Sequence, residues 1–328
     1  MKKIKWGIIG TGKIAHTFAE ALAGCEDAEL LAVASRTTEK AQKFAEKFGF
    51  KRFYGSYSQL ADDSDIDAVY IATPMASHYN DAIMCLNAGR NVLCEKTVAL
   101  NAGQLEDILS LAKQKNLFFM EAMWMKCRPV YLKMMEWIKN GKIGEPQYIK
   151  ADFSNFIPYN SNDRLFRLDC GGGALLDLGV YPLTLADAVL GTPDEILSSA
   201  HIGKDGVDLH NSIILRYNDG RFASMDNGFE IQLSNNAVIS GDKGYITLGR
   251  WFHCTCETSL FSKEGSLIEK FESPNEINGY EYEIKEVHRC LNNGLKESPL
   301  VPHADTVRVM KLMDECRRQW NMLFNEEK

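Results

Sequence analysis

The chain has 328 residues, of which 45% are hydrophobic and 25% are charged, and its formal net charge is −7. Such a length and composition are typical of an ordinary globular protein with about two domains. Because no basic block offsets the negative charge, we expect neither nucleic acid nor a membrane surface as a partner. No stretch reads as long and apolar enough to span a bilayer, and the N-terminus lacks a signal-peptide core, so we expect a cytoplasmic protein.

The nine cysteines are scattered along the chain, an odd number without the spacing of a disulfide framework. We therefore interpret them as reduced thiols, as in a cytosolic protein. The run His253-Cys254-x-Cys256 could suggest a metal site, but it lies in a strand-like stretch, and no second Cys or His pair nearby completes four ligands. We therefore predict no metal site.

The opening stretch carries a nucleotide-binding pattern. A strand-like run breaks into glycines and then into a helix-like segment rich in Ala and Leu. Gly10, Gly12 and Ala15 stand at the spacing G-x-G-x-x-A. The first glycine allows a tight turn, the second admits a pyrophosphate, and the small third residue packs helix on strand. The helix N-terminus faces the phosphates with its positive end. The predicted cofactor contacts of this turn are Gly10, Thr11, Gly12, Lys13 and Ile14.

The first 122 residues alternate strand-like and helix-like segments, which is the pattern of a parallel sheet covered on both faces. Asn101 and Gln104 stand at the spacing of a helix cap and its reciprocal partner. We therefore predict an α/β chain whose first domain, 1–122, is a Rossmann domain with a doubly wound parallel sheet. The expected strands are Ile4–Ile9, Leu30–Ser35, Arg52–Tyr54, Ala68–Ile71, Asn91–Cys94 and Phe118–Glu121, and the expected helices include Thr38–Phe48, Ser77–Ala88 and Asn101–Gln114.

The end of the second expected strand favours one nicotinamide cofactor over the other. An NAD site usually has an acid there for the ribose hydroxyls, whereas an NADP site has an Arg for the 2′-phosphate. This chain has no acid at that point and offers Ser35, Arg36, Thr37 and, one turn on, Lys40. A guanidinium binds a phosphate with a bidentate fork, although the alternative is that Arg36 is only a solvated surface charge. We predict NADP(H), with NAD(H) as the alternative.

Two further loops follow the fourth and fifth expected strands. Thr73-Pro74 and His78 follow the fourth strand, and Glu95-Lys96 ends the fifth. Ligands of open α/β sheets bind beyond the carboxyl ends of the strands, so both loops are predicted to line the cofactor. The plain alternatives are that His78 only starts a helix and that Glu95 and Lys96 form a surface salt bridge.

Beyond residue 122 the pattern changes. Strand-like runs dominate after Gly191, and Asn218-Asp219-Gly220 is a hairpin signal between two of them. These runs predict a C-terminal α+β domain, 123–328, with an open, largely antiparallel sheet for substrate binding and oligomerisation. The loop 155–168 is polar and aromatic, which suits a polyol as well as it suits an exposed loop. The expected strands are Ile196–Ile202, Ser212–Tyr217, Phe222–Asn227, Ala237–Ser240 and Tyr245–Leu248, and the expected helices include Pro129–Asn140, Gly279–Leu291 and Ala304–Phe324.

Several of these motifs resemble one oxidoreductase family. The Gly10–Ala15 turn, the Thr73-Pro74 loop with His78 and the run Ala88–Lys96 are similar to signatures of the Gfo/Idh/MocA family. The usual form of the last signature is AGKHVLCEKP. Farther on, Gly171–Pro182 is similar to the second-domain signature of that family. The resemblance covers essentially the whole chain.

Tyr181 stands where many members of the family carry His. Together with Glu121–Trp124 it most resembles the dimeric dihydrodiol dehydrogenase branch. The resemblance implies hydride transfer at a CH–OH carbon of a sugar, polyol or trans-diol, a cofactor contact from Trp124, and a second subunit against the open sheet. A homodimer or higher homo-oligomer is therefore expected. Thr97 stands where the family usually has Pro, so no proline ring fixes the backbone that presents Lys96.

Three residues are candidates for the proton transfer that accompanies hydride transfer: Lys96, Asp177 and Tyr181. If 173–190 is helical, Asp177 and Tyr181 share a face, and Pro182 requires either a kink or a helix start at Tyr181. A free tyrosine ionises near pH ~10, and a neighbouring ammonium favours the phenolate. We predict Tyr181 as the proton-transfer residue, Lys96 as its electrostatic partner and Asp177 as the orienting group. Lys96 as the acid–base is the rival, and the plain alternatives are a buried aromatic and a helix cap.

We therefore predict a cytoplasmic NADP(H)-dependent dehydrogenase that acts on the CH–OH group of a small polyhydroxylated or diol substrate. One rival is an NAD-dependent, redox-neutral glycosidase of the same family, which Arg36 and the missing strand-end acid disfavour. The other is a non-enzymatic NADP-sensing regulator, which has no need of Lys96, Asp177 and Tyr181 together. The fold supports very different substrates, so the substrate class depends on the resemblance.

Overall fold

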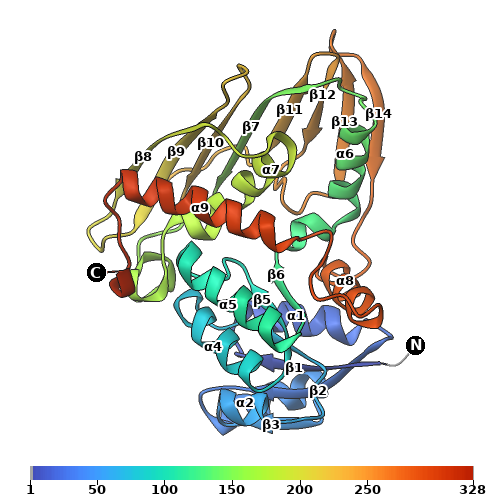
Figure 1. Ribbon diagram of the computed structural model, residues 1–328, viewed down its shortest axis with the longest axis vertical. Helices are drawn as coiled ribbons and strands as arrows, with labels where there is room; N and C mark the ends of the chain where they lie inside the picture. Colours follow the sequence, from blue (N-terminus) through green and yellow to red (C-terminus); the bar gives the residue numbers. More distant parts are fainter. Residues whose placement is uncertain (1–2, 328) are drawn as a thin grey trace. The chain divides into compact units, whose positions relative to one another are not determined.

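The computed structural model describes residues 3–327, which form two compact units (Figure 1). Unit 1 comprises the chain up to Cys127 together with Asn275–His303. Unit 2 comprises Arg128–Pro274 together with the residues from Ala304 on. Unit 1 thus runs past residue 122 and takes in a later segment, and each unit is built around a sheet of its own.

Unit 1 contains a six-stranded sheet in the order β3-β2-β1-β4-β5-β6, with every neighbouring pair parallel. The order reverses between β1 and β4, which is the switch point where ligands of doubly wound sheets bind. The central strands are largely apolar and buried, as a sheet covered on both faces requires. The predicted Rossmann fold is confirmed. The strands are β1 (Ile4–Ile9), β2 (Ala28–Ala34), β3 (Arg52–Tyr54), β4 (Ala68–Ile71), β5 (Asn91–Glu95) and β6 (Phe119–Ala122).

Side-chain caps set where several helices of unit 1 begin. Asn101 Oδ1 accepts from the backbone N–H of Gln104 at 2.9 Å, and Gln104 Oε1 accepts from the N–H of Leu100 at 3.1 Å, so the predicted cap is confirmed. Ser56 caps a short helix earlier in the chain in the same way. The segment that returns to this unit late in the chain forms α8, which packs against α1 and η1. The helices are α1 (Lys13–Ala23), α2 (Thr38–Phe48), α3 (Tyr57–Ala61), α4 (Met75–Asn87), α5 (Ala102–Lys115), the 3₁₀ turn η1 (Trp124–Cys127) and α8 (Glu281–Asn292).

Unit 2 contains an eight-stranded sheet in the order β14-β13-β12-β11-β7-β10-β9-β8. Only β7 and β10 pair in parallel, so the predicted open and largely antiparallel sheet is confirmed. The expected strands do not include β7, β13 and β14, where charged residues such as Lys150 and Glu269 interrupt the apolar pattern. The strands are β7 (Pro146–Ser154), β8 (Glu195–Ile202), β9 (Asp208–Arg216), β10 (Phe222–Gly228), β11 (Ala237–Gly241), β12 (Gly244–Leu248), β13 (Glu257–Ser262) and β14 (Leu267–Glu272).

Helices cover one face of this sheet. α7 packs on β7 and β10, α6 packs on β13 and β14, and Gln319 of α9 bonds to the backbone of β8. The pair Arg308–Asp187 joins α9 to α7. The helical elements are α6 (Pro129–Lys139), the 3₁₀ turns η2 (Arg164–Phe166), η3 (Leu168–Cys170) and η5 (Asn325–Glu327), the π-helical turn η4 (Leu175–Gly179), α7 (Val180–Leu190) and α9 (His303–Gln319).

One helical run corrects the expectation about membrane-spanning segments. Leu168–Leu190 is long and apolar enough, by length and composition, to cross a bilayer. However, 83% of its most apolar window is buried inside the folded chain. The apolar character of this run is therefore that of a core helix.

Candidate active site

Gly10 directly follows β1, at the switch point of the unit 1 sheet. Its φ is +98°, a conformation that L side chains rarely adopt, and its N–H donates to Ala34 O at 3.0 Å. A Cβ at this position would lie 2.6 Å from Ala72 O, at the end of β4. Only glycine therefore lets the chain turn between the two central strands.

The helix that follows this turn begins without a side-chain cap. Gly12 is the N-cap of α1, and a Cβ added to Gly12 would meet nothing within 4 Å. The first N–H groups of a helix lack intrahelical partners and carry a partial positive charge, so they suit an anion. The glycine turn and the uncapped N-terminus of α1 therefore fit the pyrophosphate of a dinucleotide. The predicted contacts Thr11, Lys13 and Ile14 flank this opening and are all partly or fully exposed.

The end of β2 presents the residues that were predicted to select the cofactor. The hydroxyl of Ser35 is 3.0 Å from that of Thr11, which joins the two loops. Thr37 Oγ1 caps α2 by accepting from the N–H of Lys40. Arg36 is exposed, and within residues 3–327 no hydrogen bond or ion pair holds its guanidinium. The cation is therefore available to a ligand.

His78 links the two loops that follow β4 and β5. Its side chain is 2% exposed, and its two ring nitrogens lie 2.9 Å from Thr73 O and from Thr97 O. Thr73 in turn donates its hydroxyl to Asp81 of α4 at 2.7 Å. His78 is thus more than a residue at a helix start: its ring fixes the loop after β4 to the peptide that follows Lys96.

Glu95 does not lie at the surface, as the alternative interpretation of the Glu95-Lys96 pair assumed. Glu95 is buried; its carboxylate accepts from the hydroxyl of Tyr70 and from the N–H of Lys96. Lys96 is partly exposed, and the Lys96–Thr97 peptide bond is cis. The buried glutamate thereby anchors the backbone that presents the lysine.

A second buried carboxyl group lies beside Glu95 and was not predicted. Glu283 of α8 is 0% exposed, and within the described chain neither of its carboxyl oxygens has a hydrogen-bond partner. Burial, together with the charge of Glu95, holds the pKa of Glu283 well above its usual range. Close by in sequence, Tyr280 stacks on Trp124 with the ring centroids 4.5 Å apart. No local pattern in α8 distinguishes these residues from an ordinary amphipathic helix.

Asp177 and Tyr181 lie on one continuous helical run in unit 2. Asp177 belongs to the π-helical turn η4, and Tyr181 is the second residue of α7. η4 passes into α7 without a break, so Pro182 lies inside a continuous helical run and directly after a π-helical turn. Tyr181 therefore does not stand at a free helix start, and the structure favours the other alternative, an irregular helix around Pro182.

Tyr181 and Asp177 have different surroundings. Tyr181 is 4% exposed, with its ring 4.7 Å from that of His253 and 5.6 Å from that of Phe153. His253 also stacks on Phe153 at 4.3 Å. Asp177 is partly exposed and pairs with Arg164 of the polar loop at 3.3 Å. Aromatic rings thus hold the phenol, while a cation holds the carboxylate.

A buried polar network supports the η4 turn from below, and sequence reasoning missed it. Asp208 Oδ2 accepts from the N–H of Leu175 and from Asn211 Nδ2, both at 2.8 Å, and Asn227 Nδ2 donates to Asn211 Oδ1 at 2.9 Å. Burial raises the pKa of Asp208 to about 7. The signal in the sequence is a polar residue at inward positions of β9 and β10, which otherwise alternate apolar residues inward.

The run His253-Cys254-x-Cys256 lies in the turn between β12 and β13, not in a strand as expected. Arg128 donates to Cys254 O at 2.9 Å, which fixes the turn, and His253 uses its ring to pack on Phe153. Burial raises the pKa of the Cys254 thiol, which disfavours the thiolate that a metal needs. The turn therefore supplies the ring of His253 to the aromatic side chains around Tyr181.

Comparison with known proteins agrees with this geometry. A model described as the oxidoreductase family with an NAD-binding Rossmann fold matches residues 4–123, and a model of the GFO/IDH/MocA C-terminal domain matches residues 131–247. The trans-1,2-dihydrobenzene-1,2-diol dehydrogenase of Xenopus tropicalis is 34% identical, over 98% of this chain and 99% of that protein. The chain belongs to the Gfo/Idh/MocA oxidoreductase family.

A further relative and a solved structure extend the comparison. The human trans-1,2-dihydrobenzene-1,2-diol dehydrogenase is 31% identical over 99% of both chains. KijD10, a 3-ketoreductase from Actinomadura kijaniata solved in complex with NADP and TDP-benzene, is 27% identical with a TM-score of 0.86, covering 97% of this chain and 98% of its own. The resemblance to the dihydrodiol dehydrogenases is thus confirmed. As a Gfo/Idh/MocA oxidoreductase the chain has a nicotinamide dinucleotide as its cofactor.

Proposed function

We propose that the chain is an NADP(H)-dependent dehydrogenase that oxidises a CH–OH group of a small diol, sugar or polyol, or reduces the matching ketone. The observation that carries the choice of cofactor is the end of β2, where Arg36 is exposed and no carboxylate follows the strand. A carboxylate there would repel a 2′-phosphate, whereas a guanidinium binds it with a bidentate fork.

The cofactor contacts fall into three groups of unit 1. The glycine turn and the N-terminus of α1 hold the pyrophosphate, and the residues after β2 hold the 2′-phosphate. The loops after β4 and β5, fixed to each other through His78, border the nicotinamide. When bound, the nicotinamide ring exchanges a hydride with the substrate carbon. The proposed contacts are Gly10, Thr11, Gly12, Lys13, Ile14, Ser35, Arg36, Thr37, Lys40, Thr73, Pro74, His78, Glu95, Lys96 and Trp124.

The chain's own chemistry is to move the proton of the substrate hydroxyl. In the oxidation direction the ionised phenol of Tyr181 takes that proton and becomes neutral, and in the reduction direction the neutral phenol gives the proton back. The ammonium of Lys96 favours the ionised phenol and holds the substrate oxygen. Asp177, kept in place by Arg164, accepts a hydrogen bond from a second substrate hydroxyl. The rival assignment has Lys96 exchanging the proton itself.

The substrate class is supported by relatives that act on neighbouring carbinol carbons or on a ketone. One of the two similar enzymes is a diol dehydrogenase, and the other is a 3-ketoreductase. Asp177 and Arg164 offer a polyhydroxylated ligand both an acceptor and a donor, and both side chains reach solvent. We therefore propose a small molecule with at least two oxygens near the reacting carbon.

We further propose that a second copy of the chain covers the open face of the unit 2 sheet. Leu197, Ile214 and Phe222 lie on the neighbouring strands β8, β9 and β10 and are 43%, 40% and 44% exposed. Apolar side chains gathered on one face mark an interaction surface. Light scattering on the intact protein should give twice the mass of one chain, and Ile214→Lys should return it to a monomer.

The nine free thiols support a cytosolic location.

The experiment that tests the function is nucleotide absorbance during turnover with NADP⁺ and with NAD⁺, against trans-diols, aldoses and inositols. We expect turnover with NADP⁺ and at least one diol or sugar. Equal kcat/KM with NAD⁺ would show that Arg36 does not select the cofactor. Binding of NADPH without any turnover would favour a sensor in place of an enzyme.

A further inference from the structure

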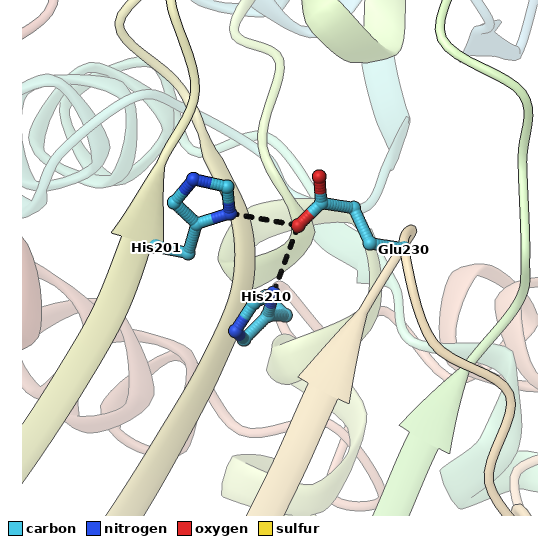
Figure 2. Close-up of side chains that lie close together, drawn as sticks. All are labelled: His201, His210 and Glu230. Carbon is cyan, nitrogen blue, oxygen red and sulfur yellow. Dashed lines mark hydrogen bonds and ion pairs between the residues drawn. The ribbon is translucent and has the colours of Figure 1, made fainter.

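Two histidines face each other at the edge of the unit 2 sheet. His201 of β8 and His210 of β9 are directly opposite in the antiparallel register, and their ring centroids are 5.2 Å apart. Glu230 follows the end of β10 and points at both rings (Figure 2). Paired strands fix the backbones of the two histidines, so the position of the rings is set by the sheet.

One carboxylate oxygen of Glu230 lies within reach of both imidazoles. Glu230 Oε2 is 2.7 Å from His201 Nδ1 and 3.0 Å from His210 Nδ1, and the three atoms lie within 4.8 Å of one another. Ligand atoms around a tetrahedral Zn²⁺ are about 3.3 Å apart when the bonds are about 2.0 to 2.1 Å long. Small side-chain rotations would meet that spacing, since the three side chains are 53%, 41% and 39% exposed.

The donor set is that of a divalent transition metal. Two imidazoles and one carboxylate are ligands that zinc sites combine, with the fourth position left to water. The residues are distant in sequence, so no short motif indicates them.

We propose that His201, His210 and Glu230 bind one divalent transition-metal ion, with Zn²⁺ as the best match. Its ligands come from β8, from β9 and from the segment after β10, so the ion would tie the edge strand of the sheet to its neighbours. None of the three residues belongs to the dehydrogenase site proposed above. His201 and His210 share the face of the sheet that carries Leu197 and Ile214, because side chains alternate along strands.

The test is titration calorimetry of the intact, EDTA-treated and dialysed protein with Zn²⁺ and with Co²⁺. We expect one ion per chain with Kd of about 10 µM or tighter. His201→Asn, which can still hydrogen-bond Glu230, should weaken binding at least about tenfold, and His201→Ala with His210→Ala should abolish it. His16→Ala, which removes a histidine from unit 1, is the matched control and should leave binding unchanged.

Two readouts distinguish this site from metal binding elsewhere on the chain. The Co²⁺ spectrum should lack the intense near-ultraviolet band of thiolate ligation, which excludes binding by the free cysteines. Added Zn²⁺ should raise the melting temperature of the wild type, but not that of the double variant, because an ion that binds only the folded state stabilises it. Kd weaker than about 100 µM, or binding that survives the double variant, overturns the proposal. Dehydrogenase activity should be the same with and without the ion.

Discussion

The candidate functional residues of unit 1 and those of unit 2 are held in place in different ways. In unit 1 the proposed dinucleotide cradle is made of backbone: a glycine with φ of +98°, the uncapped N-terminus of α1 and the carbonyl groups that flank His78. In unit 2 the surroundings of Asp177 and Tyr181 are made of side chains from β7, from β9 and β10, and from the turn after β12. The candidate residues of unit 1 therefore lie close together in the sequence, whereas the surroundings of Asp177 and Tyr181 in unit 2 come from distant segments of the chain.

This difference decides how each half tolerates change. A backbone cradle binds the part of the ligand that is common to NAD and NADP, so only its rim can select between them. A site built of side chains depends on each group separately, so single substitutions should reveal separate roles. The predictions below use that contrast, from the largest expected effect to the smallest.

Tyr181→Phe should lower kcat by about 10²- to 10⁴-fold, because positioned acid–base groups contribute that much. The ring of Tyr181 is buried among other aromatic rings. A Phe ring fills the same space, so we expect the fold to persist. Steady-state kinetics across pH checks the result. A loss within a few fold would remove Tyr181 from proton transfer and favour Lys96 as the acid–base.

The matched control for this substitution is Tyr217→Phe. The Tyr217 hydroxyl donates to Gly191 O at 2.9 Å, at the other end of the same helix α7. Its removal should lower the stability by about 1 kcal/mol and leave kcat unchanged.

Lys96→Met tests the proposed role of Lys96 as the partner of Tyr181. If the two residues act as a unit, the double variant Lys96→Met, Tyr181→Phe should be far less impaired than the product of the two single losses.

Asp208→Asn should change how the stability of unit 2 depends on pH. The folded pKa of about 7 lies above the ordinary value of 3.8, so the folded state holds a proton that the unfolded state releases. The contribution of Asp208 to the free energy of unfolding is therefore largest below pH 4. It falls between pH 4 and pH 7, by at most about 4 kcal/mol in total, and is constant above pH 7. The variant lacks this loss.

Urea unfolding between pH 4 and pH 8 measures the effect as the difference between variant and wild type. That difference should move in favour of Asp208→Asn as pH rises. Asp219→Asn is the control: the N–H of Arg221 lowers the pKa of Asp219 below 3.8, so its difference from the wild type should be nearly constant above pH 4. A pH-independent difference for Asp208→Asn would show that the pKa of Asp208 is not raised in the folded protein.

The same contrast explains which parts of the molecule the sequence predicts. The strands of unit 1, the cap at Asn101 and the turn at Gly10 follow from apolar runs and from residues a few positions apart. Glu283 of α8 is not predictable in this way, because it is a distant segment that places it beside Glu95.

The buried network of unit 2 depends on strand pairing. Asn211 of β9 lies opposite Asn227 of β10 and also bonds to Asp208, and both strands pack under η4. Their polarity at inward positions is visible in the sequence, but the partner that satisfies each group is not. The His201–His210 pair likewise depends on a register that only the folded sheet defines.

Arg36→Ala should lower kcat/KM for NADP⁺ by roughly 10- to 100-fold and leave kcat/KM for NAD⁺ unchanged, because a hydrogen bond to a charged group contributes about 1.5 to 3 kcal/mol. Lys43→Ala removes another exposed cation from α2 and is the control for overall charge. Equal losses with both cofactors would mean that Arg36 binds a part that NAD and NADP share. Other residues would then select between the two cofactors.

Arg164→Ala should have the smallest effect, a rise of a few fold in KM with little change in kcat. The side chain of Arg164 in its pair with Asp177 is 49% exposed, and exposed ion pairs contribute at most about 1 kcal/mol to stability. Arg167→Ala is the matched control, since Arg167 pairs with Asp169 in the next turn and is 43% exposed. A rise in KM for Arg164→Ala alone identifies the pair as a positioning contact for Asp177. Equal effects in the two variants would mean that the loop contributes only charge, and that Asp177 is held by η4 and the network beneath it.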